Sequence, residues 1–559
     1  MKTISTLEAP AYRGGIGTPV SARRGMVATS QPAATDAGLD VLRRGGNALD
    51  AALAANAVLA VTEPHMCGPG GDLFALVWDP ATRRLHGVNA SGRSPAGCSL
   101  STLREALGGA ATIPTRGPHC VTVPGAVDGW SLLHERFGRL AWGALFEPAI
   151  ALARAGFPVG AVTAQWWQRA VREVRAAPQV AGLDDEFLAC FAPDGGGPAA
   201  GSVRRNPALA DTFDLLAREG RAGFYEGDFA QRIVDTVARA GGTLSRDDLR
   251  RRHADWVRPL STTYRGVEVC ALPPNGQGAS VLQMLNILEG FTLPGPDSVD
   301  WWHLFIEAKK LAFTDRARYY ADPAFAQAPL ALLLDKDYAA ARRGLIEPTR
   351  ARGDYVHGGV PGSDTTYLAT ADADGMLVSL IQSIFNPFGS ALVVPGGGFA
   401  LQSRGAGFAL DPAHPNVYQP GKRPFHTIMP GFALKEGRPW LAFGAVGADM
   451  QPQAQVQILA NLVDFGCDVA SAASLPRLRH AGGPQPNGVH EAGSGVVHVE
   501  PGMPAQVVDG LRARGHDVVP IDDPIGNFVG GYQGILCDPA AGLYHGGSEP
   551  RFDGCAKGF

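Results

Sequence analysis

The chain has 559 residues, of which 45% are hydrophobic and 18% charged, and its formal net charge is −4. This near-neutral balance offers no electrostatic footprint for nucleic acid or for an anionic membrane, so neither is expected as a partner. The eight cysteines form no CxxC pair and the 14 histidines no HExxH motif, which argues against a disulfide framework and a structural zinc. The N-terminus has no continuous apolar segment of the kind that a secretory signal requires, and a cytoplasmic location is expected.

The first part of the chain has helical periodicity interrupted by strand patterns. Residues 33–61 predict two helices, because Gly45 and Gly46 end the first and Asn47 is a plausible N-cap for the second. Further helices are predicted at 127–138, 142–156, 208–250 and 298–321, and strands at 73–79, 84–90 and 267–274.

After residue 364 the pattern changes to strands. They are predicted at 365–371, 376–383, 398–403, 439–446 and 495–500. A polar, glycine-rich loop at 351–364 leads directly into Thr365. The chain thus divides into a helix-rich first part and a strand-rich last third, without an internal repeat.

The segment "DADG" at 372–375 predicts the turn of a β-hairpin. Pairing Ala371 with residue 376 or 377 places Thr365 opposite residue 382 or Ser383, on the same face of the sheet. Ser383 could then hydrogen-bond Thr365. The alternative is that both hydroxyls lie on an ordinary strand surface.

A threonine that becomes an N-terminus gains a chemistry that an internal threonine lacks. A Thr hydroxyl is a weak nucleophile and needs an adjacent base. If the Asp364–Thr365 peptide bond is cut, Thr365 acquires an α-amine with a pKa of about 7.7–8.0. That amine lies within reach of its own hydroxyl and can accept its proton near neutral pH.

An ordered set of motifs over nearly the whole length resembles the γ-glutamyltransferase family of N-terminal-nucleophile (Ntn) hydrolases. The motifs are "GMVATSQPAATDAGLDVLRRGGNALDAALAANAVLAVTEP" (25–64), "TVPGAVDGW" (122–130), "FYEGDFA" (224–230), "EAKKLAFTDRARYYADPAF" (307–325), "PGKRPFHTIMP" (420–430) and "LPRLRH" (475–480). "CGPGGD", "SGRSP", "PPNGQG" and "LQSRG" are most similar to the branch that contains oxamate amidohydrolase and acylase-like relatives.

The resemblance implies an α/β fold, an αββα sandwich with two stacked antiparallel sheets, made as a single precursor. The precursor would cut itself between Asp364 and Thr365 into a large subunit, 1–364, and a small subunit, 365–559, which stay together. Thr365 matches the nucleophile, and Ser383 matches a residue that hydrogen-bonds it. Gly447 and Ala448 match the paired glycines whose N–H groups form the oxyanion hole.

Several family positions differ in this chain. Ala406 and Gly407 stand where γ-glutamyl transpeptidases carry the acidic pair that grips the substrate's α-amino group. His426 and Thr427 replace paired serines, and Ser91 replaces the arginine for the α-carboxylate.

The substrate-binding candidates are therefore Arg93, Arg404, His426 and Thr427, since an arginine would suit a carboxylate without a neighbouring ammonium. Three of them also have a structural interpretation in place of substrate binding. The two arginines could form ion pairs, and His426 could make a buried hydrogen bond. Asp449 is interpreted as a helix cap in preference to a substrate ligand.

These observations predict an autoprocessing Ntn amidohydrolase that opens an amide bond through an acyl-Thr365 intermediate, with a small carboxylate-bearing amide such as oxamate as substrate. The mechanism implies no metal or organic cofactor. The first alternative is a γ-glutamyltransferase or glutathione hydrolase, and the second is an unprocessed binding homologue. A G-x-S-x-G elbow and a P-loop are both absent from the sequence. The sequence is compatible with a homo-oligomer and does not indicate its size.

Overall fold

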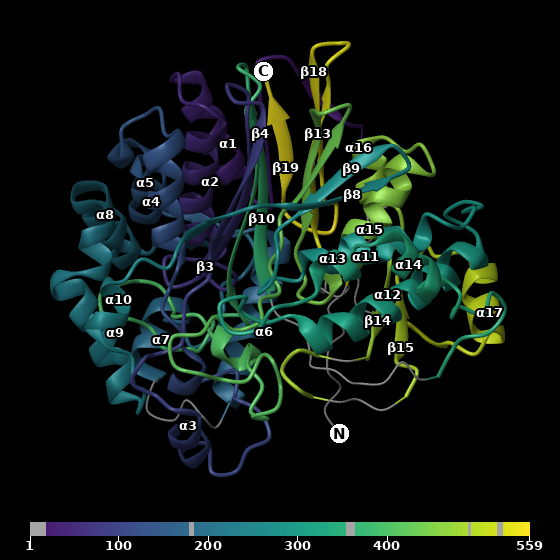
Figure 1. Cartoon of the computed structure of the whole chain (residues 1–559). Coiled ribbons are helices and arrows are strands. Elements are labelled where there is room, and N and C mark those ends of the chain that lie inside the picture. The colour runs from purple at the N-terminus through teal and green to yellow at the C-terminus, as the bar shows by residue number, and fades with distance from the viewer. Residues whose placement is uncertain (1–17, 178–183, 354–363, 484, 490–492, 522–528) are drawn as a thin grey trace, which may run out of the picture.

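In the computed structural model, the described residues are 18–177, 184–353, 364–483, 485–489, 493–521 and 529–559. Within them, two seven-stranded sheets pack face to face through the centre of the molecule, and helices cover the outer face of each (Figure 1). All strand neighbours in both sheets are antiparallel. The predicted αββα sandwich is confirmed. Among the described helices, none combines the length and apolarity needed to cross a bilayer.

The first sheet contains Thr365 near its centre. Its strands, in spatial order, are β19 (Cys555–Gly558), β2 (Gly25–Thr29), β10 (Asp364–Asp372), β11 (Leu377–Phe385), β3 (Asp72–Asp79), β4 (Arg84–Ala90) and β7 (Asp255–Val257). The second sheet has the order β1 (Val20–Ala22), β18 (Leu543–Ser548), β17 (Tyr532–Asp538), β13 (Arg438–Ala445), β12 (Gly431–Lys435), β9 (Val267–Ala271) and β8 (Leu260–Tyr264).

Side chains on the central strands alternate between two hydrophobic cores. On β3, Leu73 and Val77 pack against the helices, whereas Phe74 and Leu76 lie between the two sheets. Successive side chains of a strand point to opposite faces, so a strand buried on both faces reads as the continuous apolar run found here.

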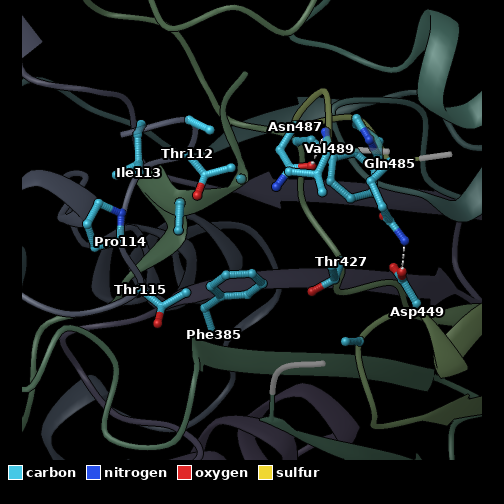
Figure 2. Close-up of a pocket in the computed structure, with 16 residues that line it drawn as sticks. Thr112, Ile113, Pro114, Thr115, Phe385, Thr427, Asp449, Gln485, Asn487 and Val489 are labelled. Carbon is cyan, nitrogen blue, oxygen red and sulfur yellow. Dashed lines mark hydrogen bonds between the residues drawn. The ribbon is translucent and has the colours of Figure 1, made fainter. Parts of the chain in front are cut away.

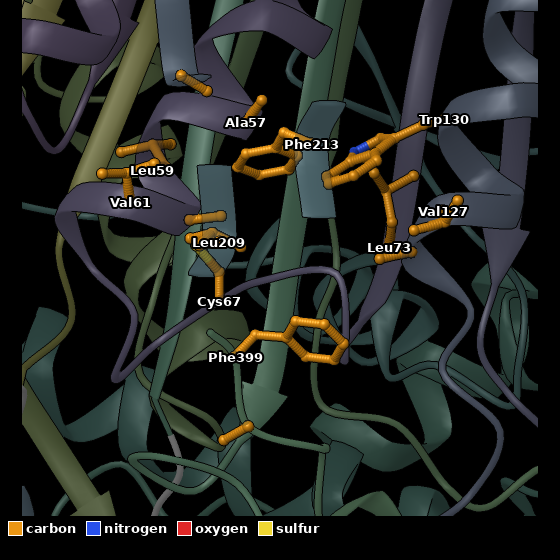
Figure 3. Packing of buried hydrophobic residues seen from close by; sticks show 14 of the residues in the cluster. Ala57, Leu59, Val61, Cys67, Leu73, Val127, Trp130, Leu209, Phe213 and Phe399 are labelled. Carbon is orange, nitrogen blue, oxygen red and sulfur yellow. The ribbon is translucent and has the colours of Figure 1, made fainter. Parts of the chain in front are cut away.

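The helices outside the first sheet come from the first half of the chain. They are α1 (Pro32–Arg43), α2 (Ala48–Thr62), α4 (Ala126–Phe137), α5 (Glu147–Ala155), α6 (Ala161–Ala176), α7 (Asp184–Phe191), α8 (Pro207–Tyr225), α9 (Gly227–Arg239) and α10 (Arg246–Arg250). Figure 3 shows part of this layer, where Leu73 lies near Trp130 and Phe213.

The second sheet is covered by a separate layer. Its helices are α11 (Gly278–Leu288), α12 (Val299–Tyr319), α14 (Lys336–Arg343), α15 (Met450–Val463), α16 (Val469–Ser474) and α17 (Ala505–Ala513), joined by a small sheet of β14 (Leu478–Ala481), β15 (Val496–Val499) and β16 (Asp517–Pro520). The remaining elements are α3 (Leu100–Ala106), α13 (Leu330–Leu333), the pair β5 (Phe157–Pro158) and β6 (Val203–Arg204), and short 3₁₀ turns at Pro118–Cys120, Trp142–Leu145 and Arg404–Gly407.

Most predicted elements are present, with two instructive differences. Asn47 caps α2 through a capping box with Asp50, as its position suggested. The helix predicted at 142–156 is divided, because Pro148 cannot continue the preceding turn and instead starts α5. The strand predicted at 398–403 is wrong. That segment is a loop whose backbone bonds go to neighbouring loops and, from Ser403, to Ile384 at the end of β11, and Gly398 within it has a φ of +71°.

The hairpin register matches one of the two predicted alternatives, since Ala371 pairs with Leu377. The pairing then shifts near the start of β10, where Asp364 lies opposite Phe385 and Thr366 opposite Gln382. Ser383 and Ile384 of β11 therefore both lie opposite Thr365, so β11 carries a β-bulge at this point, a feature that is common beside functional sites.

The two sheets approach closely where Gly444 of β13 faces Tyr367 of β10. A Cβ at Gly444 would lie 2.4 Å from the Tyr367 ring. That ring is buried, and its hydroxyl is hydrogen-bonded to Ser379 Oγ at 2.8 Å. We expect Gly444→Ala to lower the free energy of unfolding in urea by about 1–3 kcal/mol, because an overpacked core must shift backbone or ring. Gly97→Ala is the matched control, since nothing lies within 4 Å of its Cβ position. Equal stability of the two variants would contradict this account.

Candidate active site

Thr365 is buried at the start of β10, at the end of the sandwich where the bulge lies. The side-chain amide of Gln451 points its Nε2 toward Thr365 Oγ1 at 3.5 Å. The other end of that amide is fixed, because Gln451 Oε1 accepts the N–H of Met429 at 3.1 Å. Gln451, in the first turn of α15, therefore holds the hydroxyl of Thr365 against the second sheet. Sequence reasoning missed Gln451, which is one of several glutamines in this helix.

The loop between β13 and α15 presents two backbone N–H groups beside this hydroxyl. Gly447 and Ala448 have φ values of +116° and +49°, and neither N–H has an acceptor in the described part of the chain. The loop is fixed from behind by Gln277, whose Nε2 donates to the carbonyls of Ala448 at 2.9 Å and Thr427 at 2.6 Å. Gln451 N–H also donates to the Ala448 carbonyl at 3.0 Å, which connects the loop to the side chain that contacts Thr365. Two fixed donors without an internal acceptor can stabilise an oxyanion.

Ser383 and Thr427 are joined by a buried guanidinium. Arg404 donates through Nη2 to Ser383 Oγ at 2.6 Å and through Nη1 to Thr427 Oγ1 at 2.7 Å. Ser383 Oγ also accepts the N–H of Phe385 at 2.9 Å. The hydrogen bond from Ser383 to Thr365 stays a prediction.

The cation of Arg404 is unusual because it is 1% exposed and, among the described residues, no carboxylate lies within 4.0 Å of it. Burial lowers the pKa of Arg404 to about 9, against the opposing effect of the more distant Asp72. A buried cation without a direct counter-ion creates a positive potential that favours an anion nearby.

His426 lies behind this group in contact with Asp72, on the strand next to β11. Asp72 Oδ1 accepts the N–H groups of Gly92 and Gly125 at 3.0 and 3.1 Å, and Oδ2 faces His426 Nε2 at 3.1 Å. Burial raises the pKa of Asp72 to about 7 and holds the pKa of His426 well below its ordinary value. His426 thus makes a buried hydrogen bond, as its structural interpretation predicted. Asp72 was not predicted, although it ends the "CGPGGD" motif.

Arg93 lies apart from the other predicted residues. Its guanidinium is 3.2 Å from Asp322 and 3.8 Å from Asp255, and it also donates to the carbonyl of Gly421. These contacts correspond to the ion-pair interpretation, and Arg93 is not among the residues that line the cavity described next.

A cavity of about 460 Å³ opens beside the Gly447–Ala448 loop. In Figure 2, the segment 112–115 forms one wall, Phe385 and Thr427 lie along one side, and Gln485, Asn487 and Val489 lie opposite. The lining residues are Ala111, Thr112, Ile113, Pro114, Thr115, Phe385, Ala406, Gly407, Phe425, Thr427, Ala448, Asp449, Gln485, Pro486, Asn487 and Val489. This size suits a small organic ligand.

Among the described residues of that lining, Asp449 alone is charged, and its predicted role as a helix cap is wrong. It stands at the N-cap position of α15, but its side chain makes no capping hydrogen bond. Its carboxylate instead pairs with Arg316 at 2.8 Å and accepts from Gln485 Nε2, and these partners lower its pKa despite its burial. The charge of Asp449 is therefore already compensated, which weakens its attraction for a substrate ammonium.

A family model described as gamma-glutamyltranspeptidase matches residues 34–559. The chain belongs to this family. Over 544 residues it is 37% identical to the glutathione hydrolase-like YwrD proenzyme of Bacillus subtilis (strain 168), a match that covers 95% of this chain and 98% of that protein. It is 34% identical to the oxamate amidohydrolase proenzyme of Klebsiella pneumoniae subsp. pneumoniae, with 96% and 98% covered. The crystal structure of cephalosporin acylase from Bacillus halodurans matches with a TM-score of 0.89 at 40% identity, covering 100% and 99%.

The family resemblance and the fold are thus confirmed, and the protein is an Ntn amidohydrolase of the gamma-glutamyltranspeptidase family. In this member, hydrogen bonds link five of the predicted residues into one group around Thr365: Ser383, Arg404, Thr427 and the Gly447–Ala448 loop. His426 lies behind the group and Arg93 outside it.

The left-handed conformation of Ala448 yields a stability prediction. An alanine with φ near +50° is strained, and glycine removes the clash of Cβ with the following carbonyl. We expect Ala448→Gly to raise the free energy of unfolding by about 1 kcal/mol, whereas Ala445→Gly, three residues earlier in β13, should lower it by about 0.5–1 kcal/mol. Urea unfolding of the two variants beside the wild type measures both. A loss of stability in Ala448→Gly would show that the alanine methyl contributes packing that exceeds the strain.

Proposed function

We propose that Thr365 is the nucleophile of this amidohydrolase and that the Gly447 and Ala448 N–H groups form its oxyanion hole. The observation that carries the proposal is the linkage through Gln451, which contacts Thr365 Oγ1 with its side chain and the Ala448 carbonyl with its backbone. A nucleophile and two fixed donors on facing sheets are the geometry that acyl transfer needs.

The nucleophile is activated by cleavage of the Asp364–Thr365 bond. The cut produces a large subunit, 1–364, and a small subunit, 365–559, and frees the α-amine of Thr365. The segment 354–363, which contains most of the predicted loop before the cut, lies outside the described residues. β10 supports the proposal from the other side, since its position in mid-sheet would keep a new N-terminus in place.

In the reaction, the α-amine takes the proton of Thr365 Oγ1 as this oxygen attacks the amide carbonyl carbon. The carbonyl oxygen becomes an oxyanion that accepts the N–H groups of Gly447 and Ala448. The C–N bond then breaks, and the leaving amine takes the proton from the ammonium of Thr365. Water attacks the resulting Thr365 ester, with the same amine as base, and releases the carboxylic acid. Ser383 positions Thr365 by a hydrogen bond between the two hydroxyls.

For the substrate, we propose a small amide that carries a carboxylate, such as oxamate. Thr427 lines the cavity and hydrogen-bonds Arg404, a cation with no carboxylate within 4.0 Å among the described residues, so an anion at Thr427 gains its attraction. Ala406 and Gly407 line the same cavity without an acidic side chain, and Asp449 is already paired with Arg316. The arrangement favours a carboxylate without a neighbouring ammonium over a γ-glutamyl group.

The nucleophile is tested by processing. The wild-type chain should give fragments of 364 residues and the remaining 195, about 38 and 20 kDa in proportion to the full 58.5 kDa, with the smaller one beginning Thr-Thr-Tyr-Leu. Thr365→Ala should stay whole and inactive, whereas the matched control Thr366→Ala should still be cut. Denaturing gels and N-terminal sequencing measure this. A wild-type chain that is never cut would favour the non-catalytic binding homologue.

The substrate proposal is tested by a charge comparison. Arg404→Gln should lower kcat/KM for oxamate relative to oxamide, its neutral analogue, by about 10- to 100-fold, because a charge-assisted bond is worth about 1.5–3 kcal/mol. Arg93→Gln serves as the control and should leave this ratio unchanged. An unchanged ratio in Arg404→Gln would remove Arg404 from substrate recognition. Turnover of a γ-glutamyl anilide without turnover of oxamate would favour the glutathione hydrolase alternative.

A further inference from the structure

A second cluster of chemically active side chains lies in the layer outside the second sheet. His303 and Glu307 are one turn apart on α12, and His516 precedes β16. All three are buried, and a ligand atom from each lies within 4.8 Å of those of the other two. We propose that this cluster is a binding site for a divalent transition-metal ion, Zn²⁺ in the first instance.

The two imidazoles are arranged as metal ligands with an outer hydrogen bond. His303 Nε2 lies 2.8 Å from the backbone carbonyl of Glu347, which can only accept, so Nε2 carries the proton and Nδ1 offers a lone pair. His303 Nδ1 is 2.8 Å from His516 Nε2, and His516 is therefore the donor in that bond. A ligating histidine whose other N–H is held by a carbonyl is the arrangement typical of metal sites.

Glu307 supplies the independent observation that points to a ligand. Its Oε1 accepts from Lys310 at 2.7 Å, whereas its Oε2 is buried without a hydrogen-bond partner among the described residues. A buried carboxylate oxygen without a partner is costly, and a cation beside it removes the cost. Two imidazole nitrogens and one carboxylate oxygen are a known ligand set of Zn²⁺, with water in the fourth position.

Binding requires one proton to move. The proton on His516 Nε2 shifts to Nδ1 through solvent, so that both imidazoles bind the ion as neutral ligands and Glu307 as a carboxylate. Lys310 and Arg514 are the nearby cations that oppose the ion. Arg514 is paired with Asp300, which limits its opposition, whereas Lys310 and the ion would share the charge of Glu307.

The site joins the two sides of the proposed cut, since His303 and Glu307 precede Thr365 and His516 follows it. An ion here would fasten the subunits at a place distant from the hairpin. This consequence rests on the proposed cleavage, whereas metal binding itself does not. Binding is therefore measured on the full-length wild type and on Thr365→Ala, so that failure of processing and failure of metal binding can be distinguished.

The test uses Zn²⁺ alone. Each protein is incubated with zinc, dialysed against metal-free buffer and measured for bound zinc by mass spectrometry, with affinity from titration calorimetry. We expect one zinc per chain in the wild type and in Thr365→Ala. His516→Asn and the isosteric Glu307→Gln should bind about 100-fold more weakly or not at all. His545→Asn is the matched control, because His545 bonds Ser21 on the exposed edge of the second sheet, and it should keep the ion.

The visible spectrum of the Co²⁺-loaded protein distinguishes loss of the metal site from a folding defect. Visible absorption bands of four-coordinate cobalt should be present in the wild type and lost in Glu307→Gln, with circular dichroism unchanged. Two results would overturn the proposal: no retained zinc in the wild type, or equal retention in the wild type and in a folded Glu307→Gln.

Discussion

β10 is held on both edges and both faces, and the position of every group around Thr365 depends on this. Its edges are hydrogen-bonded to β2 and β11, its Tyr367 packs between the sheets, and its Leu368 packs under the helices. Because the strand cannot slip without moving side chains to the wrong face, its first residues have a fixed place even if the chain before them is cut. Thr365 lies two residues before Tyr367 and therefore faces the second sheet, where Gln451 and the Gly447–Ala448 loop lie.

A second constraint is the buried polar network that surrounds Thr365. Arg404 spans Ser383 on the first sheet and Thr427 on the loop before β12, and Gln277 connects Thr427 with Ala448. Each group is oriented by a bond to another group of the same network, so little reorganisation is needed when charge develops. The strained Ala448 belongs to this network, as strained residues at functional sites often do.

The sequence predicts a feature of this fold well when the residues that form it are close together in the chain. Local rules predicted α2 and its Asn47 cap, the "DADG" turn and the pairing of Ala371 with Leu377, because each involves neighbours in the chain. The same rules failed where a tertiary contact prevailed: residues 398–403 bond to neighbouring loops and to the end of β11, and the Asp449 side chain bonds to Arg316 in place of its own helix. Groups joined across the chain, such as Arg404 with Ser383 or His303 with His516, have no spacing that sequence reasoning can recognise. Family resemblance supplied Thr365 and the Gly447–Ala448 loop, but not Gln451.

The wall of the cavity is drawn from both sides of residue 365. Ala111 to Thr115 come from before it, and Phe385 to Val489 come from after it. Under the proposed function, substrate preference is therefore a joint property of two stretches of chain that the cut would make into separate polypeptides. Replacing one of these stretches with that of a relative would give a cavity whose two walls come from different proteins. Mutations that adapt the cavity to a new acyl group would therefore have to change both stretches together.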